Sequence, residues 1–256
     1  MYKILANTIF LGKDVHFLPE CHSTNDKAFQ LVRERIAKEG TIIITENQTF
    51  GKGQRGNTWS VEPGKNLTFS LVLRPDFLDI SEQFYLNMAV SNAIYEVLVD
   101  YIPHLQLKWP NDLIVPGFGK LGGILIENSL GSKGWEYAVV GLGLNVNQTD
   151  FSMNGPTSLK KLTGSEFNLE ELFRLLITRI EKHYLTLKKR GFNQIKNTYL
   201  SHLFLKGEWA EYQIPSGKFE GKIVGVDSFG RLEIEAKNGE LQCFEFKTIQ
   251  FPNYHS

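Results

Sequence analysis

The sequence predicts an α+β fold, with a larger domain of helices and strands at residues 1–205 and a small all-β barrel at residues 206–256. Up to about residue 205, segments with helical periodicity alternate with short apolar runs that are typical of strands. Beyond it, only short runs of alternating apolar and polar residues remain, separated by glycine-containing turns. The length of 256 residues allows one substantial core and a second, smaller one.

Two helices and two strands are expected in the first part of the chain. A helix is predicted at 23–39, because a Ser-Thr pair can cap its start, apolar residues recur at helical spacing and a glycine follows. The runs at 41–47 and 66–73 are rich in β-branched and apolar residues and are typical of strands. A long amphipathic helix is expected to begin near Ser81.

Three further strands, one long helix and the strands of the barrel follow. The three strands are predicted at 105–109, 121–128 and 135–147. The helix is expected between a cap at Asn168 and a stop at Gly191, with an apolar stripe along its length. The four strands of the barrel are predicted at 208–214, 221–228, 230–236 and 241–246.

The composition is that of an ordinary globular protein, with 42% hydrophobic residues, 22% charged residues and a formal net charge of zero. No dense basic stripe is present, so no nucleic-acid partner is expected. No apolar run approaches the roughly 18 residues of a membrane span, and the start lacks the features of a signal peptide. A cytoplasmic protein without membrane contact is expected, with Cys21 and Cys243 as reduced thiols.

A glycine-rich loop at residues 51–59 carries more information than any other segment. Its three glycines are interleaved with the cations Lys52 and Arg55, and Trp59 ends it. Because glycine has no Cβ, backbone amides can approach one oxyanion closely while the cations neutralise its charge. Such a loop is also compatible with a plain tight connection. It therefore favours a phosphate or carboxylate cradle only if other segments agree with it.

Three other polar patterns lie at the ends of predicted elements. Residues 23–25 (Ser-Thr-Asn) cap a helix and expose hydroxyl and amide groups. Residues 108–112 (Lys-Trp-Pro-Asn-Asp) end a strand, and residues 120–127 begin with a lysine beside paired glycines that let a ligand approach the backbone. Residues 141–147 (Gly-Leu-Gly-Leu-Asn-Val-Asn) end another strand. Taken singly, each pattern also fits a structural role as a cap, a turn or a surface lysine.

No complete signature of another kind of site is present. The pattern at 141–147 lacks the third glycine of a dinucleotide fingerprint, and the phosphate-binding sequence GxxxxGK[ST] is absent. The six histidines are dispersed without metal-ligand spacing, and no serine has the surroundings of a nucleophile elbow. The remaining cations, amides, glycines and one carboxylate suit phosphoryl or adenylyl transfer, in which positioning and charge neutralisation supply most of the rate.

Together and in this order, the four patterns resemble those of biotin–protein ligases, that is, biotin–[acetyl-CoA-carboxylase] ligases, over essentially the whole chain. The resemblance implies a mixed β-sheet flanked by helices, like that of class II aminoacyl-tRNA synthetases, and a C-terminal SH3-like β-barrel. It implies activation of biotin with ATP and Mg²⁺ to biotinyl-5′-AMP. The biotinyl group would then pass to one lysine of a biotin carboxyl carrier protein.

The resemblance also implies roles for single residues. Lys120 would hold the biotin carboxylate and the α-phosphate, with Lys52 and Arg55 as further catalytic cations. Asp112 would bind Mg²⁺ or orient the lysine. The residues implied to bind biotin are Ser23, Thr24, Asn25, Gln48, Gly51, Lys52, Gly53, Lys120, Gly123 and Gly141. The residues implied to bind the nucleotide are Arg55, Trp59, Asn111, Lys120, Gly143 and Asn145.

Two departures from the family pattern lead to further expectations. Gln54 and Asn57 stand where many relatives carry arginines, and neither can supply a guanidinium fork to a phosphate. We therefore expect Lys52 and Arg55 to take over part of the clamp and the adenylate to be held less tightly. The first 22 residues leave no room for a helix-turn-helix, so a monofunctional enzyme without operator binding is expected.

Two alternative functions remain open from the sequence. A lipoate–protein ligase has a related fold and chemistry, but its arginine- and glycine-rich RRxSGGG-type loop is absent, and residues 108–112 favour biotin. A non-catalytic biotin- or nucleotide-binding module would bind ligand without releasing pyrophosphate. Edge strands of the central sheet could also pair two copies into a homodimer.

Overall fold

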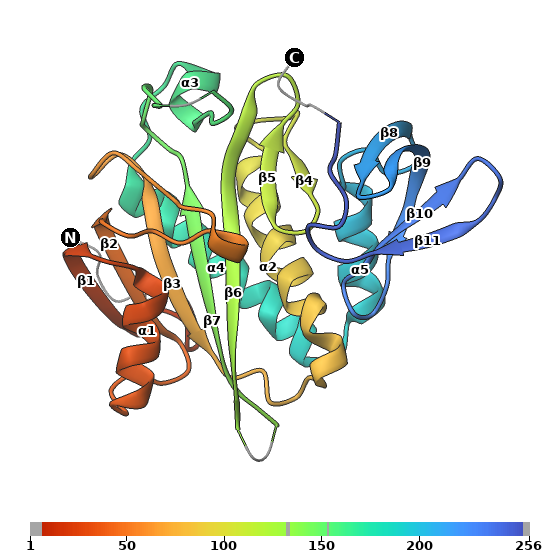
Figure 1. Cartoon of the computed structure of the whole chain (residues 1–256). Coiled ribbons are helices and arrows are strands. Elements are labelled where there is room, and N and C mark those ends of the chain that lie inside the picture. Colours follow the sequence, from red (N-terminus) through yellow and green to blue (C-terminus); the bar gives the residue numbers. More distant parts are fainter. Residues whose placement is uncertain (1–6, 132–133, 153, 253–256) are drawn as a thin grey trace.

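A seven-stranded mixed sheet with helices on both faces forms the larger part of the molecule (Figure 1). The computed structural model describes residues 7–131, 134–152 and 154–252, and of Arg55 it describes the backbone only. The strands lie in the order β1-β2-β3-β7-β6-β5-β4, in which β1 and β2 are parallel and every other neighbouring pair is antiparallel. Their bounds are β1 Asp14–Cys21, β2 Thr41–Gln48, β3 Leu67–Leu73, β4 Gln106–Lys108, β5 Asp112–Val115, β6 Gly119–Gly131 and β7 Gly134–Leu144.

Two helices, α1 and α4, start at the caps that the sequence predicts. Ser23 accepts a hydrogen bond from the amide of Asp26, and Asn168 accepts from the amides of Glu170 and Glu171. The α-helices are α1 Thr24–Arg33, α2 Gln83–Leu98, α3 Leu159–Thr163, α4 Leu169–Lys188 and α5 Phe192–Ser201. Short 3₁₀ turns occur at η1 Gln54–Gly56 and η2 Ile80–Glu82. None of the helices in the described part of the chain is long and apolar enough to cross a membrane.

The predicted helix at 23–39 is wrong at its C-terminal end, because α1 stops at Arg33. Arg35 adopts the left-handed conformation, with φ of 58°, that usually falls to glycine at a helix end. The amides of Ile36 and Ala37 both return to the carbonyl of Leu31, so the last turn closes before the glycine at position 40. Ile36 is 54% exposed and does not continue the buried stripe.

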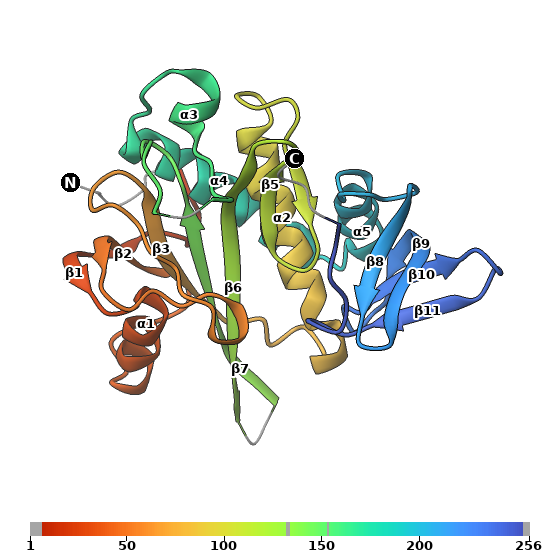
Figure 2. The same ribbon diagram turned by 45° about the horizontal axis from the view of Figure 1, so that its top comes forward.

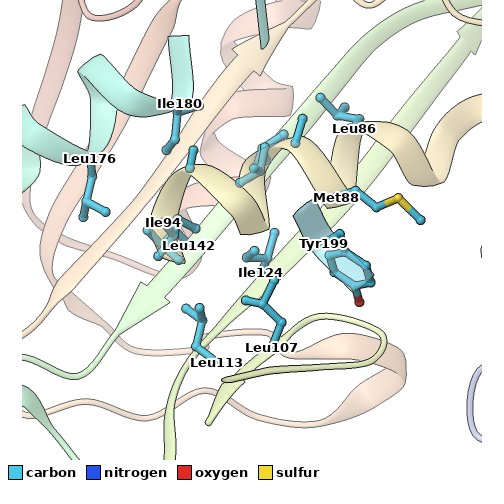
Figure 3. Packing of buried hydrophobic residues seen from close by; sticks show 14 of the residues in the cluster. Leu86, Met88, Ile94, Leu107, Leu113, Ile124, Leu142, Leu176, Ile180 and Tyr199 are labelled. Carbon is cyan, nitrogen blue, oxygen red and sulfur yellow. The ribbon is translucent and has the colours of Figure 1, made fainter. Parts of the chain in front are cut away.

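The two faces of the seven-stranded sheet carry different cores. On one face, α2 and α4 cover a large apolar cluster that includes Leu86 and Ile94 of α2, Leu176 of α4, and Ile124 and Leu142 of the sheet (Figure 3). On the other face, α1 covers a small cluster formed by Ala28, Leu31, Ala37, Ile43, Val72 and Val139.

Farther along the face that α1 covers, the side chains change in kind. Thr68 and Ser70 of β3 stand there in place of branched apolar residues, opposite Gly143 and Gly141 of β7. Side chains alternate between the faces of a strand, so this pair lies on the face of Val72. The missing glycine side chains leave room above the sheet, and this room is where the candidate site lies.

A separate antiparallel sheet, in the order β11-β10-β9-β8, lies beside α5 and the turn before β5 (Figure 2). Its size and position agree with the predicted SH3-like barrel. Trp109 connects the two parts, because its indole N–H donates to the carbonyl of Gly230 at 2.8 Å and its ring packs against Phe246 and Phe251. The strands are β8 Trp209–Ile214, β9 Gly217–Val226, β10 Leu232–Ala236 and β11 Leu241–Phe244.

Candidate active site

A polar pocket lies on the α1 face of the sheet, between the start of α1, the glycine-rich loop and strands β6 and β7. It collects residues from all four sequence patterns. The predicted site residues that line it are Ser23, Thr24, Asn25, Gln48, Lys52, Gly53, Trp59, Asn111, Lys120, Gly123, Gly141 and Gly143. Asp112 and Asn145 line two adjoining hollows that also contact Trp59 and Lys120. Gly51 is buried at the start of the loop, and the Arg55 side chain lies outside the described structure.

A hydrogen-bonded network fixes the end of the pocket near α1. The amide of Thr24 donates to Gln48 Oε1 at 2.8 Å. The buried Ser70 hydroxyl donates to Asn25 Oδ1 at 2.6 Å and lies 2.7 Å from the hydroxyl of Thr24. The Asn25 amide nitrogen donates in turn to Glu127 Oε2 at 2.7 Å. Each of these polar groups therefore has a defined orientation toward the pocket.

The glycine-rich loop is closed by its own backbone. The amide of Trp59 donates to the carbonyl of Gly51 at 2.8 Å, and the amide of Gly53 donates to the carbonyl of Asn57 at 2.7 Å. These two amides are used inside the loop and do not form part of an oxyanion cradle. A Cβ on Gly51 would overlap the carbonyl oxygen of Trp59, so the close approach of the two chain segments explains this glycine.

Lys52 is placed at the rim of the pocket rather than at its centre. Its Nζ donates to Asp26 Oδ1 of α1 at 2.7 Å, and both side chains are about half exposed. This hydrogen bond raises the pKa of Lys52, so the amine stays charged. Lys52 therefore supplies a fixed positive charge beside the pocket and also joins the loop to α1.

Lys120 and Asp112 form the charged centre. Lys120 Nζ lies 2.6 Å from Asp112 Oδ1 and 5.9 Å from the centre of the Trp59 ring, while Lys108 Nζ lies 3.9 Å from Asp112 Oδ2. Burial lowers the pKa of Lys108. The backbone of Lys120 is held at both ends, by the carbonyl of Gly155 and the amide of Thr157. The Asp112 carboxylate is thus in a position to orient Lys120, which is one of the two roles expected for it.

The other role of Asp112 was that of a magnesium ligand. The described residues include no cluster of three or more His, Cys, Asp or Glu side chains that could enclose a metal ion. One carboxylate already shared by two lysines can add at most a single protein ligand. Mg²⁺ commonly binds in this way, through few carboxylates together with substrate phosphates and water.

The predicted nucleotide-binding residues lie around the same centre. The indole ring of Trp59 covers Gly143, and a Cβ at Gly143 would overlap it. The side-chain nitrogen of Asn111 donates to the carbonyl of Ile124 at 2.5 Å, and that of Asn145 donates to the carbonyl of Thr157 at 3.0 Å. Both side-chain amides therefore hold backbone carbonyls at the strand ends beside the pocket.

Sequence reasoning missed several residues of the site. Asp26, Ser70 and Glu127 hold predicted residues in place, and Thr68 lines the pocket directly. For Thr68 and Ser70 a signal existed, because polar residues alternate with Leu67, Phe69 and Leu71 in an otherwise apolar strand. Asp26 and Glu127 have no such signal, since only the fold brings them near their partners.

Two sequence relatives and one solved structure show what this chain is similar to. The bifunctional ligase/repressor of Bacillus spizizenii is 29% identical over 238 residues, which cover 91% of this chain and 72% of that protein. The biotin–[acetyl-CoA-carboxylase] ligase of Paracoccus denitrificans is 28% identical over 231 residues, or 87% of this chain and 94% of that protein. The biotin protein ligase of Aquifex aeolicus, solved in complex with biotin and ATP, superposes with a TM-score of 0.77 at 26% identity, covering 94% of this chain and 99% of that one.

A family model points the same way. It describes the biotin/lipoate A/B protein ligases and matches residues 18–145, which include the start of α1, the glycine-rich loop and the strands that carry Lys120 and Gly141. The matched segment thus contains nearly all of the pocket. The chain therefore belongs to the biotin/lipoate A/B protein ligase family.

Proposed function

We propose that this protein is an ATP-dependent biotin–protein ligase. It activates biotin to biotinyl-5′-AMP with release of pyrophosphate and then transfers the biotinyl group to a lysine of a biotin carboxyl carrier domain. The observation that carries the proposal is the position of Lys120 at the junction of the polar pocket and both adjoining hollows, held by Asp112. One amine there can reach an acid bound in the pocket and a nucleotide bound beside it.

The first step has to overcome the repulsion between two anions. The carboxylate oxygen of biotin attacks the α-phosphorus of ATP, the bond to the bridging oxygen of pyrophosphate breaks, and pyrophosphate carries the negative charge away. Lys120 supplies positive charge close to this centre, and the partly buried Lys108 adds to it when protonated. Mg²⁺ bound to the phosphates would lower the remaining charge. Asp112 limits the motion of Lys120, which keeps the amine in position.

The second step needs no nucleophile from the enzyme. The neutral amine of the acceptor lysine attacks the acyl carbon, the bond to the phosphate oxygen breaks, AMP leaves, and one proton passes to solvent. The carrier domain, a cytoplasmic location and the absence of a nucleic-acid partner remain parts of the proposal. The zero net charge supports the last of these.

Pyrophosphate exchange tests the function directly. Labelled pyrophosphate should enter ATP when biotin is present and should not do so with lipoate. Labelled biotin should then appear on a carrier domain. Exchange with lipoate alone would support the lipoate–protein ligase, and biotin binding without exchange would support a non-catalytic module.

Gly141→Ala tests where biotin lies. An added Cβ would overlap Asn25 Oδ1, which would break its hydrogen bond with Ser70 and push Asn25 into the pocket. We expect the Kd for biotin, measured by calorimetry, to rise at least about tenfold, the loss of one or two hydrogen bonds. Gly64→Ala is the control. Its Cβ would meet nothing within 4 Å, although φ of 71° costs about 1–2 kcal/mol of stability. An unchanged Kd in Gly141→Ala would place biotin elsewhere.

Gln54→Arg tests the expected loose retention of the adenylate. Gln54 lines the pocket, the adjoining hollow that contains Asp112, and a further hollow bordered by Phe229 and Phe246. The amide of Gln54 cannot neutralise a phosphate there. A guanidinium there should slow the release of biotinyl-5′-AMP about tenfold or more, as expected for a charge-assisted hydrogen bond. Gln30→Arg, which adds the same charge on the exposed face of α1, should leave release unchanged. If the wild type, Gln54→Arg and Gln30→Arg all release biotinyl-5′-AMP at the same rate, the expectation of loose retention is wrong.

A further inference from the structure

Thr68 carries a buried hydroxyl for which the described structure provides no hydrogen-bond partner. The residue is only 4% exposed and lines the pocket. A buried hydroxyl without a partner costs about 1–3 kcal/mol of stability. Valine has nearly the same shape and lacks this cost, so a packing role alone does not explain threonine here.

Strand geometry explains why the hydroxyl has no protein partner. Thr68 and Ser70 lie on the same face of β3, two residues apart, and their cross-strand neighbours on β7 are Gly143 and Gly141. Ser70 is satisfied by Asn25 and the Thr24 hydroxyl at the start of α1. Thr68 lies one step farther from α1, where the glycine opposite it has no side chain to offer.

A second unpartnered polar atom lies beside Thr68. The indole nitrogen of Trp59 is also buried without a partner, and it lies against Gly143, the residue that pairs with Thr68. Both atoms belong to residues that line the same pocket. Two buried, unsatisfied polar groups on neighbouring residues of one pocket indicate that a bound molecule completes their hydrogen bonding.

We propose that Thr68 is a further biotin-binding residue, whose hydroxyl forms a hydrogen bond with the biotin half of the bound adenylate. This inference rests on the proposed function. Thr68 stands between the Ser70 end of the pocket and the indole of Trp59, so its hydroxyl faces the middle of a molecule that reaches from α1 to Lys120. Because the Thr68 hydroxyl is buried in the free protein, the proposal requires the indole beside Gly143 to move when that molecule binds.

Thr68→Val should change stability and binding in opposite directions. Without biotin, removal of an unsatisfied hydroxyl should raise the Tm, by about 2–4 °C for each kcal/mol gained in a chain of this size. The Kd for biotin alone, measured by calorimetry, should rise about three- to tenfold, the value of one neutral hydrogen bond. In pyrophosphate exchange, the KM for biotin should rise by the same factor and kcat should change less.

Two further variants separate this role from a structural one. Thr68→Ser keeps the hydroxyl and should bind biotin nearly as well as the wild type. Ser70→Ala removes a hydroxyl that does have protein partners, so its Tm should fall rather than rise. A lower Tm for Thr68→Val would show that the hydroxyl already has a partner in the free protein, such as a buried water, and would overturn the inference.

Biotin binding by the wild type separates a failure of the inference on Thr68 from a failure of the proposed function. If the wild type binds biotin and Thr68→Val binds it equally well, the inference on Thr68 is wrong and the proposed function stands. If Thr68→Val weakens binding only when a nucleotide is present, the hydroxyl contacts the nucleotide half and the assignment to biotin is wrong. A wild type that binds no biotin contradicts the proposed function and the inference together.

Discussion

Lys120→Ala is expected to lower the rate of biotinyl-5′-AMP formation at least about 100-fold, with little change in Tm. The amine lies 2.6 Å from Asp112 and about one-third of its side chain is exposed, so its removal leaves no cavity in the core. Loss of one preorganised contact with charge that develops in the transition state costs about 10²–10³ in rate. Single-turnover formation of labelled biotinyl-5′-AMP measures the step directly.

The control for Lys120 has to separate position from charge. Lys237→Ala removes a lysine that is ion-paired with Glu220 in the C-terminal sheet, and it should keep the wild-type rate. Asp112→Asn keeps the Lys120 amine but removes the carboxylate that holds it. Its rate of biotinyl-5′-AMP formation should therefore lie between the rates of Lys120→Ala and the wild type. If adenylate forms at the wild-type rate in Lys120→Ala, positive charge at this position is not needed for the reaction.

Trp109→Ala is expected to destabilise the protein by about 3–5 kcal/mol, the range for removal of a buried tryptophan. The side chain is 2% exposed and packs against Phe246 and Phe251. Its indole is also the donor to the carbonyl of Gly230. Urea unfolding at constant m-value measures the change in the free energy of unfolding.

Two variants show which part of Trp109 matters. Trp109→Phe keeps much of the ring but leaves the Gly230 carbonyl without its donor, so a smaller loss is expected. Trp209→Ala truncates a tryptophan that is 46% exposed on β8 and should cost less than about 1 kcal/mol. A loss in Trp109→Ala no larger than that in Trp209→Ala would mean that this residue does not anchor the C-terminal sheet.

The sequence predicts elements whose signals are local. Helix caps at Ser23 and Asn168 are correct, because capping depends on residues within one turn. The strands β1 Asp14–Cys21 and β5 Asp112–Val115 were not predicted. β1 is an edge strand that contains a proline and has no fully buried residue, and β5 has only four residues. The alternation of polar and apolar residues in β1 covers only its first four residues before Leu18 and Pro19 break it, and β5 has none.

The candidate site shows the same division between local and long-range signals. Short motifs predicted most residues that line the pocket, since each motif lies at the end of one element. The partners that orient them come from far along the chain. Asn25 contacts Ser70 and Glu127, which are 45 and 102 residues away, and only the order of strands in the sheet brings the three together. No spacing within a single sequence contains that information.

A crystal structure with biotin and a non-hydrolysable ATP analogue tests the whole account most directly. We expect the vitamin above Gly141, between the start of α1 and strand β6, and the nucleotide on the far side of Lys120, with the amine of Lys120 in hydrogen-bond distance of both the carboxylate and the α-phosphate. If the two ligands lie in separate places, or if neither one touches that amine, the mechanism is wrong.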